Sequence, residues 1–245
     1  MTRRFPLLAT LLLIPSVGLS SGCDFLDQLQ QRTGIVDVFA ASHGTPDEQG
    51  NLPTHNGEQL IFVNDMGWEV FIDEGYVTTS AVILEACDGQ RFNVELYWGP
   101  LAEDIGATAD RESNGLGGVR ADSGTYCQMM VEYAPTADTV ENPDAIGSTV
   151  YLTGSALKGG KHIDFLWKTD MTIEVPVDIS NIEAGGPFRV SENQNFAKDL
   201  TITKSYDQFF AGVDFNDKLT QGDVEALISA TLMEGTIAKV DDAPY

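Results

Sequence analysis

The feature that most constrains the fold is a period-two alternation of apolar and polar residues over residues 172–179. The apolar positions are Ile173, Val175, Val177 and Ile179, and the polar or proline positions between them are Thr172, Glu174, Pro176 and Asp178. Successive side chains of a β-strand point to opposite faces, so this pattern predicts a strand with one buried face. Pro176 places the strand at a sheet edge, because proline cannot donate a ladder hydrogen bond.

Similar short apolar segments, separated by turn residues, recur along the chain. The expected strands are Ile35–Ala41, Leu60–Val63, Trp68–Asp73, Tyr76–Cys87, Arg91–Trp98, Thr125–Tyr133, Thr149–Thr153 and His162–Lys168, with two more near Phe188 and Leu200. Asn64–Gly67 predicts a hairpin turn. Residues 42–58 and 100–118 are expected to be long loops, because polar and turn-forming residues dominate them.

One helix is expected near the C-terminus. Thr220 and Asp223 have the spacing of a capping box, and apolar residues then follow at helical intervals, from Val224 to Leu232. Many short strands with one late helix predict an all-β fold, an antiparallel β-sandwich with one short C-terminal helix. With no internal repeat or linker, residues 35–245 are expected to form a single domain.

The first 23 residues resemble the signal of a bacterial lipoprotein. Arg3 and Arg4 precede an apolar run, and the small residues of LSSGC lead to Cys23. The resemblance implies cleavage after residue 22, lipidation of Cys23 and a tether over residues 23–34. It departs from the usual pattern in having Ser20 three residues before the cysteine. The alternative is an ordinary cleaved signal that leaves Cys23 as a thiol.

The remaining cysteines, Cys87 and Cys127, are expected to form a disulfide, since each lies at or in a strand-like segment and an exported compartment permits pairing. A metal-binding or catalytic thiol is the alternative, but no histidine lies near either cysteine in sequence.

The mature chain is strongly acidic. Residues 23–245 hold 12 basic and 37 acidic side chains, a net charge of −25. Such a charge excludes nucleic acid and anionic lipid headgroups as expected partners. Either solubility in a salty medium or cation binding by clustered carboxylates accounts for it.

Four segments of the mature chain resemble the MbnP-like periplasmic copper-binding proteins. These are TTSAVILEAC, GTYCQMMVEYAP, KSYDQFFAGVDF and EALISATLMEGTI. The resemblance implies a β-sandwich and a role in copper handling. No metal ligand of that family can be aligned with a residue here.

The histidines His43, His55 and His162 are the candidate metal ligands, because imidazole is the commonest ligand of copper and zinc. A shared site requires all three to converge; solvated or capping histidines are the alternative. Asp65, Met66 and one methionine of the Met129-Met130 pair are weaker candidates. Calcium in the acidic loop with Glu103, Asp104, Asp110 and Glu112 is a second metal option.

Four aromatic side chains are candidates for a sugar-stacking platform: Trp68, Trp98, Trp167 and Tyr97. Core packing is the alternative, since Trp68 and Trp98 fit the interior positions of their expected strands. No motif pairs a nucleophile with a base, so no enzyme is expected. The sequence therefore predicts an exported, lipid-anchored binding protein of the cell envelope. It binds either a transition metal, copper first, or a protein or glycan partner.

Overall fold

The computed structural model describes residues 33–46, 53–57, 59–105, 113–135, 142–192 and 197–240. All of them belong to one unit, Arg32–Tyr245. The predicted signal peptide and Cys23 lie outside the described residues, as do Asp110 and Glu112. Among the described residues, no helix is long and apolar enough to cross a membrane.

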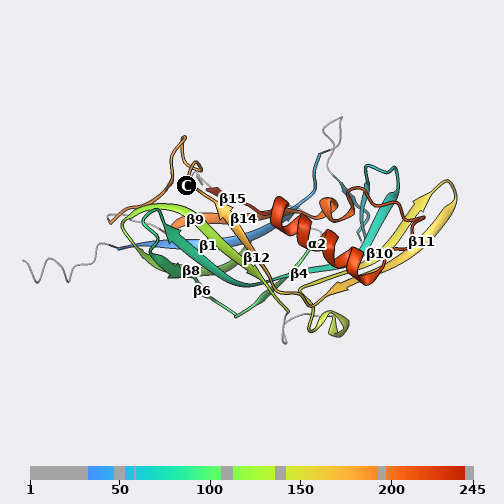
Figure 1. The fold of residues 1–245 in the computed structure, drawn as a ribbon, viewed down its shortest axis with the longest axis horizontal. Helices are drawn as coiled ribbons and strands as arrows, with labels where there is room; N and C mark the ends of the chain where they lie inside the picture. The colour runs from blue at the N-terminus through green and yellow to red at the C-terminus, as the bar shows by residue number, and fades with distance from the viewer. Residues whose placement is uncertain are drawn as a thin grey trace, which may run out of the picture. The chain divides into compact units, whose positions relative to one another are not determined.

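The strands form two sheets, as the predicted β-sandwich requires (Figure 1). The first sheet has the order β15-β14-β1-β8-β6, made of β1 (Thr33–His43), β6 (Glu95–Leu96), β8 (Asn114–Asp122), β14 (Lys198–Ser205) and β15 (Ile237–Val240). The second contains β2 (Thr54–His55), β3 (Leu60–Val63), β4 (Glu69–Ala86), β5 (Arg91–Asn93), β7 (Leu101–Asp104), β9 (Gly124–Tyr133), β10 (Val150–Lys158), β11 (Lys161–Thr169), β12 (Ile173–Asp178) and β13 (Phe188–Val190). Among the described strands, all the pairings are antiparallel except that of β1 with β14.

The inner faces of the two sheets supply one hydrophobic core. Val36 and Val38 of β1 and Ile202 of β14 join the same buried cluster as Val82 of β4 and Val131 of β9. Their burial supplies most of the stabilisation, at roughly 25 cal/mol for each Å² of apolar surface removed from water.

The helix α2 (Gln221–Gly235) is the predicted C-terminal helix, and it packs against β11, β12 and β14 (Figure 1). Its capping box is formed: the Thr220 side chain accepts from the Asp223 amide, and Asp223 accepts from the Thr220 amide. Two short 3-10 helices, η1 (Pro143–Ala145) and η2 (Tyr206–Phe210), complete the described elements.

The disulfide between Cys87 and Cys127 is present, with the two Cα atoms 4.8 Å apart. It joins the end of β4 to its neighbour β9 and closes a loop of 40 residues. The predicted edge position of Pro176 is also confirmed: among the described strands, β12 pairs with β9 alone.

Two expected strands, Trp68–Asp73 and Tyr76–Cys87, are one continuous 18-residue strand, β4. Gly75 lies between the two expected strands. Its backbone carbonyl accepts from the Ile105 amide, and a β carbon there would lie 2.5 Å from the Ile105 side chain. The glycine therefore makes room for a packing contact and does not form a turn.

The expected strand Arg91–Trp98 is wrong, because the chain crosses between sheets within it. β5 pairs with β4 in one sheet, whereas β6 pairs with β8 in the other. Consequently Trp98 lies outside the core with 79% of its surface exposed.

The expected loop over residues 100–118 is also wrong, since it contains β7 and the start of β8. Its glycines suggested a loop, but Gly117 permits close strand pairing: a β carbon there would lie 2.2 Å from the Glu95 carbonyl oxygen. Glu103, expected in an acidic calcium loop, lies in β7 and forms a buried ion pair with Lys204 of β14. This carboxylate is therefore not available to a calcium ion.

Candidate functional site

The structure does not bring the three histidines together. His55 lies on β2 and His162 on β11, at opposite ends of the strand order β11-β10-β4-β3-β2. Four strand spacings separate them, about 19 Å, whereas ligand bonds of roughly 2 Å require convergence on one point. Each histidine also has its own local contact. The Nδ1 atom of His43 lies 3.3 Å from Ser205 Oγ, and that of His55 lies 2.9 Å from the Gly57 amide. The Nδ1 atom of His162 lies 3.7 Å from Asp164 Oδ1.

The described part of the chain contains no group of three or more His, Cys, Asp or Glu side chains able to hold a metal ion. The weaker candidates have structural contacts: Asp65 accepts from the Gly212 amide at 2.7 Å, and the Met66 carbonyl accepts from Lys158. Met129 is fully buried in the core. Copper binding stays a prediction without support from this geometry.

The four aromatic candidates for a sugar platform divide into two buried and two exposed side chains. Trp68 and Trp167 are core residues, and Trp167 stacks on Phe210 with 4.7 Å between ring centroids. Tyr97 and Trp98 are exposed, by 57% and 79%. They follow β6 at the edge of the first sheet. Two consecutive aromatics before Gly99-Pro100 were a usable signal, because neighbouring strand residues cannot both face one core.

Tyr97 borders an open groove of about 850 Å³ on this sheet. The groove is lined by residues of β1, β5, β6 and β8 together with Tyr97, and its polar side chains are Asp37, Arg91, Asn93, Glu95 and Arg120. Ile35, Phe92 and Leu96 add apolar surface. The groove therefore offers both hydrogen-bonding groups and apolar surface to a ligand.

The Tyr97 side chain lies across β8. Its hydroxyl donates to Asp37 Oδ1 of β1 at 3.2 Å, although β8 separates β1 from β6. On β8, a β carbon at Gly115 would lie 3.8 Å from Tyr97 Cε2, and one at Gly118 would lie 3.3 Å from the hydroxyl. These two glycines form a floor on which the ring lies, while more than half of the side chain faces solvent.

Electrostatics keep this arrangement in one protonation state. Burial, the Asp37 charge and the hydrogen bond to Asp37 together raise the pKa of Tyr97. The phenol therefore stays protonated at neutral pH and remains the donor. The sequence did not reveal Asp37 as a site residue, because it meets Tyr97 only through the β1–β8 and β6–β8 pairings.

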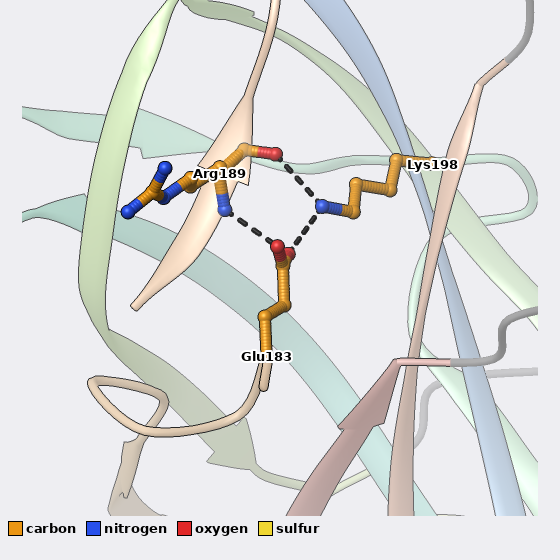
Figure 2. A network of polar contacts seen from close by, with 3 residues as sticks. All are labelled: Glu183, Arg189 and Lys198. Carbon is orange, nitrogen blue, oxygen red and sulfur yellow. Dashed lines mark hydrogen bonds and ion pairs between the residues drawn. The ribbon is translucent and has the colours of Figure 1, made fainter. Parts of the chain in front are cut away.

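A second polar cluster joins Glu183, Arg189 and Lys198 (Figure 2). The Glu183 carboxylate accepts from the Arg189 amide at 3.1 Å and from Lys198 Nζ, which also donates to the Arg189 carbonyl at 3.0 Å. These side chains satisfy the backbone of β13 on the side away from β9. The Arg189 guanidinium points away from both partners. We interpret this cluster as structural.

The comparisons add little to this geometry. No protein-family model matches the sequence, and no curated protein matches it. Among solved structures, MbnP from Methylosinus trichosporium is similar: 12% of residues are identical, the match covers 74% of this chain and 79% of that chain, and the TM-score is 0.41. The chain therefore weakly resembles MbnP, at a level of similarity that carries no argument about function.

Proposed function

We propose that this protein is an exported, lipid-anchored binding module that recognises a carbohydrate in the Tyr97 groove and acts without turnover. The observation that carries the proposal is the exposed Tyr97 ring lying on the Gly115–Gly118 floor beside polar groups. A saccharide ring has an apolar C–H face and a rim of hydroxyls. An exposed aromatic face can contact the C–H face of the sugar, because the π-system of the aromatic ring carries partial negative charge.

The polar groups of the groove suit the hydroxyl rim. Asp37 and Glu95 accept hydrogen bonds from sugar hydroxyls, and Asn93 both accepts and donates. Both carboxylates belong to residues paired with Gly118, one from each side, so they flank the glycine floor. A sugar over Tyr97 thus has acceptors on both flanks. Copper is not part of this proposal, because the histidines lie on separate strands.

The test is binding of the purified full chain to a panel of immobilised oligosaccharides, with a peptide library in parallel. Tyr97→Ala should weaken saccharide binding by roughly tenfold or more, the effect of losing a central aromatic contact. Tyr97→Phe keeps the ring and should weaken binding less. Leu166→Ala, at a residue 61% exposed on β11, is the control and should change nothing.

Absence of saccharide binding by the unaltered protein would overturn the proposal, as would binding that ignores Tyr97→Ala. Peptide binding that depends on Tyr97, without saccharide binding, would assign the groove to a protein partner instead.

A further inference from the structure

Arg120 carries a positive charge on the wall of the Tyr97 groove. It is exposed on β8, opposite Ile35 of β1, and its Nη1 donates to Thr33 Oγ1 at 3.3 Å. No carboxylate among the described residues forms an ion pair with it. The other groove arginine differs, since Arg91 Nε pairs with Glu85 at 2.7 Å. One of the two guanidinium groups is therefore available to a ligand.

The position of Arg120 relative to the Tyr97 ring follows from the register of β8. Arg120 lies two residues beyond Gly118 on the same face, which places their Cα atoms about 7 Å apart. Asp37 and Glu95 are the strand neighbours of Gly118. The carboxylates of Asp37 and Glu95 thus lie beside the Tyr97 ring. The Arg120 guanidinium lies further along the groove, two residues from Gly118 on β8.

We propose that the groove selects a sugar that carries a carboxylate, such as a uronic acid, and that Arg120 binds this carboxylate. The inference rests on the proposed carbohydrate function and names the substrate class of that site. The planar guanidinium can hold both carboxylate oxygens at once, while Asp37 and Glu95 repel a carboxylate and favour hydroxyls. The ligand is thereby oriented with its charged end at Arg120.

The acidity of the whole chain limits how much charge the ligand carries. A densely charged polyanion meets the field of the mature chain, whose net charge over residues 23–245 is −25. That field is screened within about 8 Å at physiological ionic strength. A single carboxylate at Arg120 interacts mainly with the guanidinium at contact distance. The expected ligand is therefore a saccharide with isolated acidic residues.

The experiment compares oligosaccharides that contain one uronate with their methyl esters, which keep the sugar and remove the charge. The unaltered full chain should bind at least one acid roughly tenfold more tightly than its ester, as expected for a charge-assisted hydrogen bond. Arg120→Gln should abolish this preference and leave ester binding unchanged. Arg189→Gln makes the same charge change on β13, outside the groove, and should preserve the preference.

Each outcome separates the two proposals. Equal binding of acid and ester by the unaltered protein, or a preference that survives Arg120→Gln, overturns the role of Arg120 and leaves carbohydrate binding intact. Failure of every saccharide to bind overturns both proposals. Loss of acid and ester binding alike in Arg120→Gln also contradicts charge selection, since the residue would then contribute to shape alone.

Discussion

At the scale of single residues, Lys204 and Glu103 form an ion pair inside the core between the two sheets. Their side chains are only 3% and 2% exposed. Removing one partner leaves an uncompensated buried charge, so we expect Lys204→Met to lower the free energy of unfolding by about 3–5 kcal/mol. Adding Glu103→Leu should restore much of the loss.

Denaturant unfolding of the two variants measures this effect. The control is Arg91→Gln, which breaks the ion pair with Glu85, where the side chains are 61% and 21% exposed. It should cost less than about 1 kcal/mol. Equal effects of Lys204→Met and Arg91→Gln would contradict the interpretation.

Two of the buried groups also predict how stability depends on pH. Burial lowers the pKa of Lys204, but the charges of Glu103 and Tyr133 and the hydrogen bond to Glu103 together raise it, so the net shift is upward. Burial and the nearby Asp122 and Asp88 charges raise the pKa of Tyr126 from 10.0 to about 12. Both groups hold their protons more tightly in the folded chain than in the unfolded chain.

The stability that these shifts contribute is complete below pH 10 and is lost as pH rises toward 12. We therefore expect the free energy of unfolding to fall over this range. Tyr126→Phe, which cannot ionise, should reduce the slope in urea titrations at stepped pH. A steeper slope in the variant would show that the sign is wrong.

At the scale of elements, two side chains supply hydrogen bonds to the backbone of β13. Glu183 and Lys198 bind the amide and carbonyl of Arg189 on the side away from β9. We expect Glu183→Ala to expose this amide, to speed its hydrogen exchange and to cost roughly 1–2 kcal/mol of stability. Hydrogen exchange measured at Arg189 checks this. Arg189→Gln changes the side chain alone and should leave the exchange rate of that amide unaltered.

The elements also show where prediction from sequence ends. The alternation of Ile173–Ile179 and the capping box at Thr220 are local patterns, and both predicted their elements well. The glycines of β8 were misleading because their role is nonlocal: Gly117 admits β6, and Gly118 lies beneath Tyr97. A glycine required by strand pairing cannot be told from a loop glycine by its sequence neighbours.

At the scale of the whole molecule, the site is harder to predict than the fold. The sandwich follows from many independent alternating segments, so errors in single strands did not alter the fold class. The groove depends on a single arrangement, in which β1, β8 and β6 lie side by side. Tyr97 was recognised as an aromatic candidate, whereas Asp37 and Arg120 became site residues only through that register.

The position of the groove in the chain makes a final prediction about anchoring. Ile35, at the start of β1, lines the groove and follows Cys23 by 12 residues. A chain segment of that length spans at most about 43 Å. Lipid on Cys23 would therefore hold the Tyr97 groove within this distance of the membrane surface. We expect Cys23→Ser to move the protein from the membrane fraction to the soluble fraction, and the N-terminal peptide to lose the mass of its acyl chains. Saccharide binding by the released protein should be unchanged, because the substitution alters none of the residues that line the groove. Retention of Cys23→Ser in the membrane fraction would show that something other than this lipid holds the protein there.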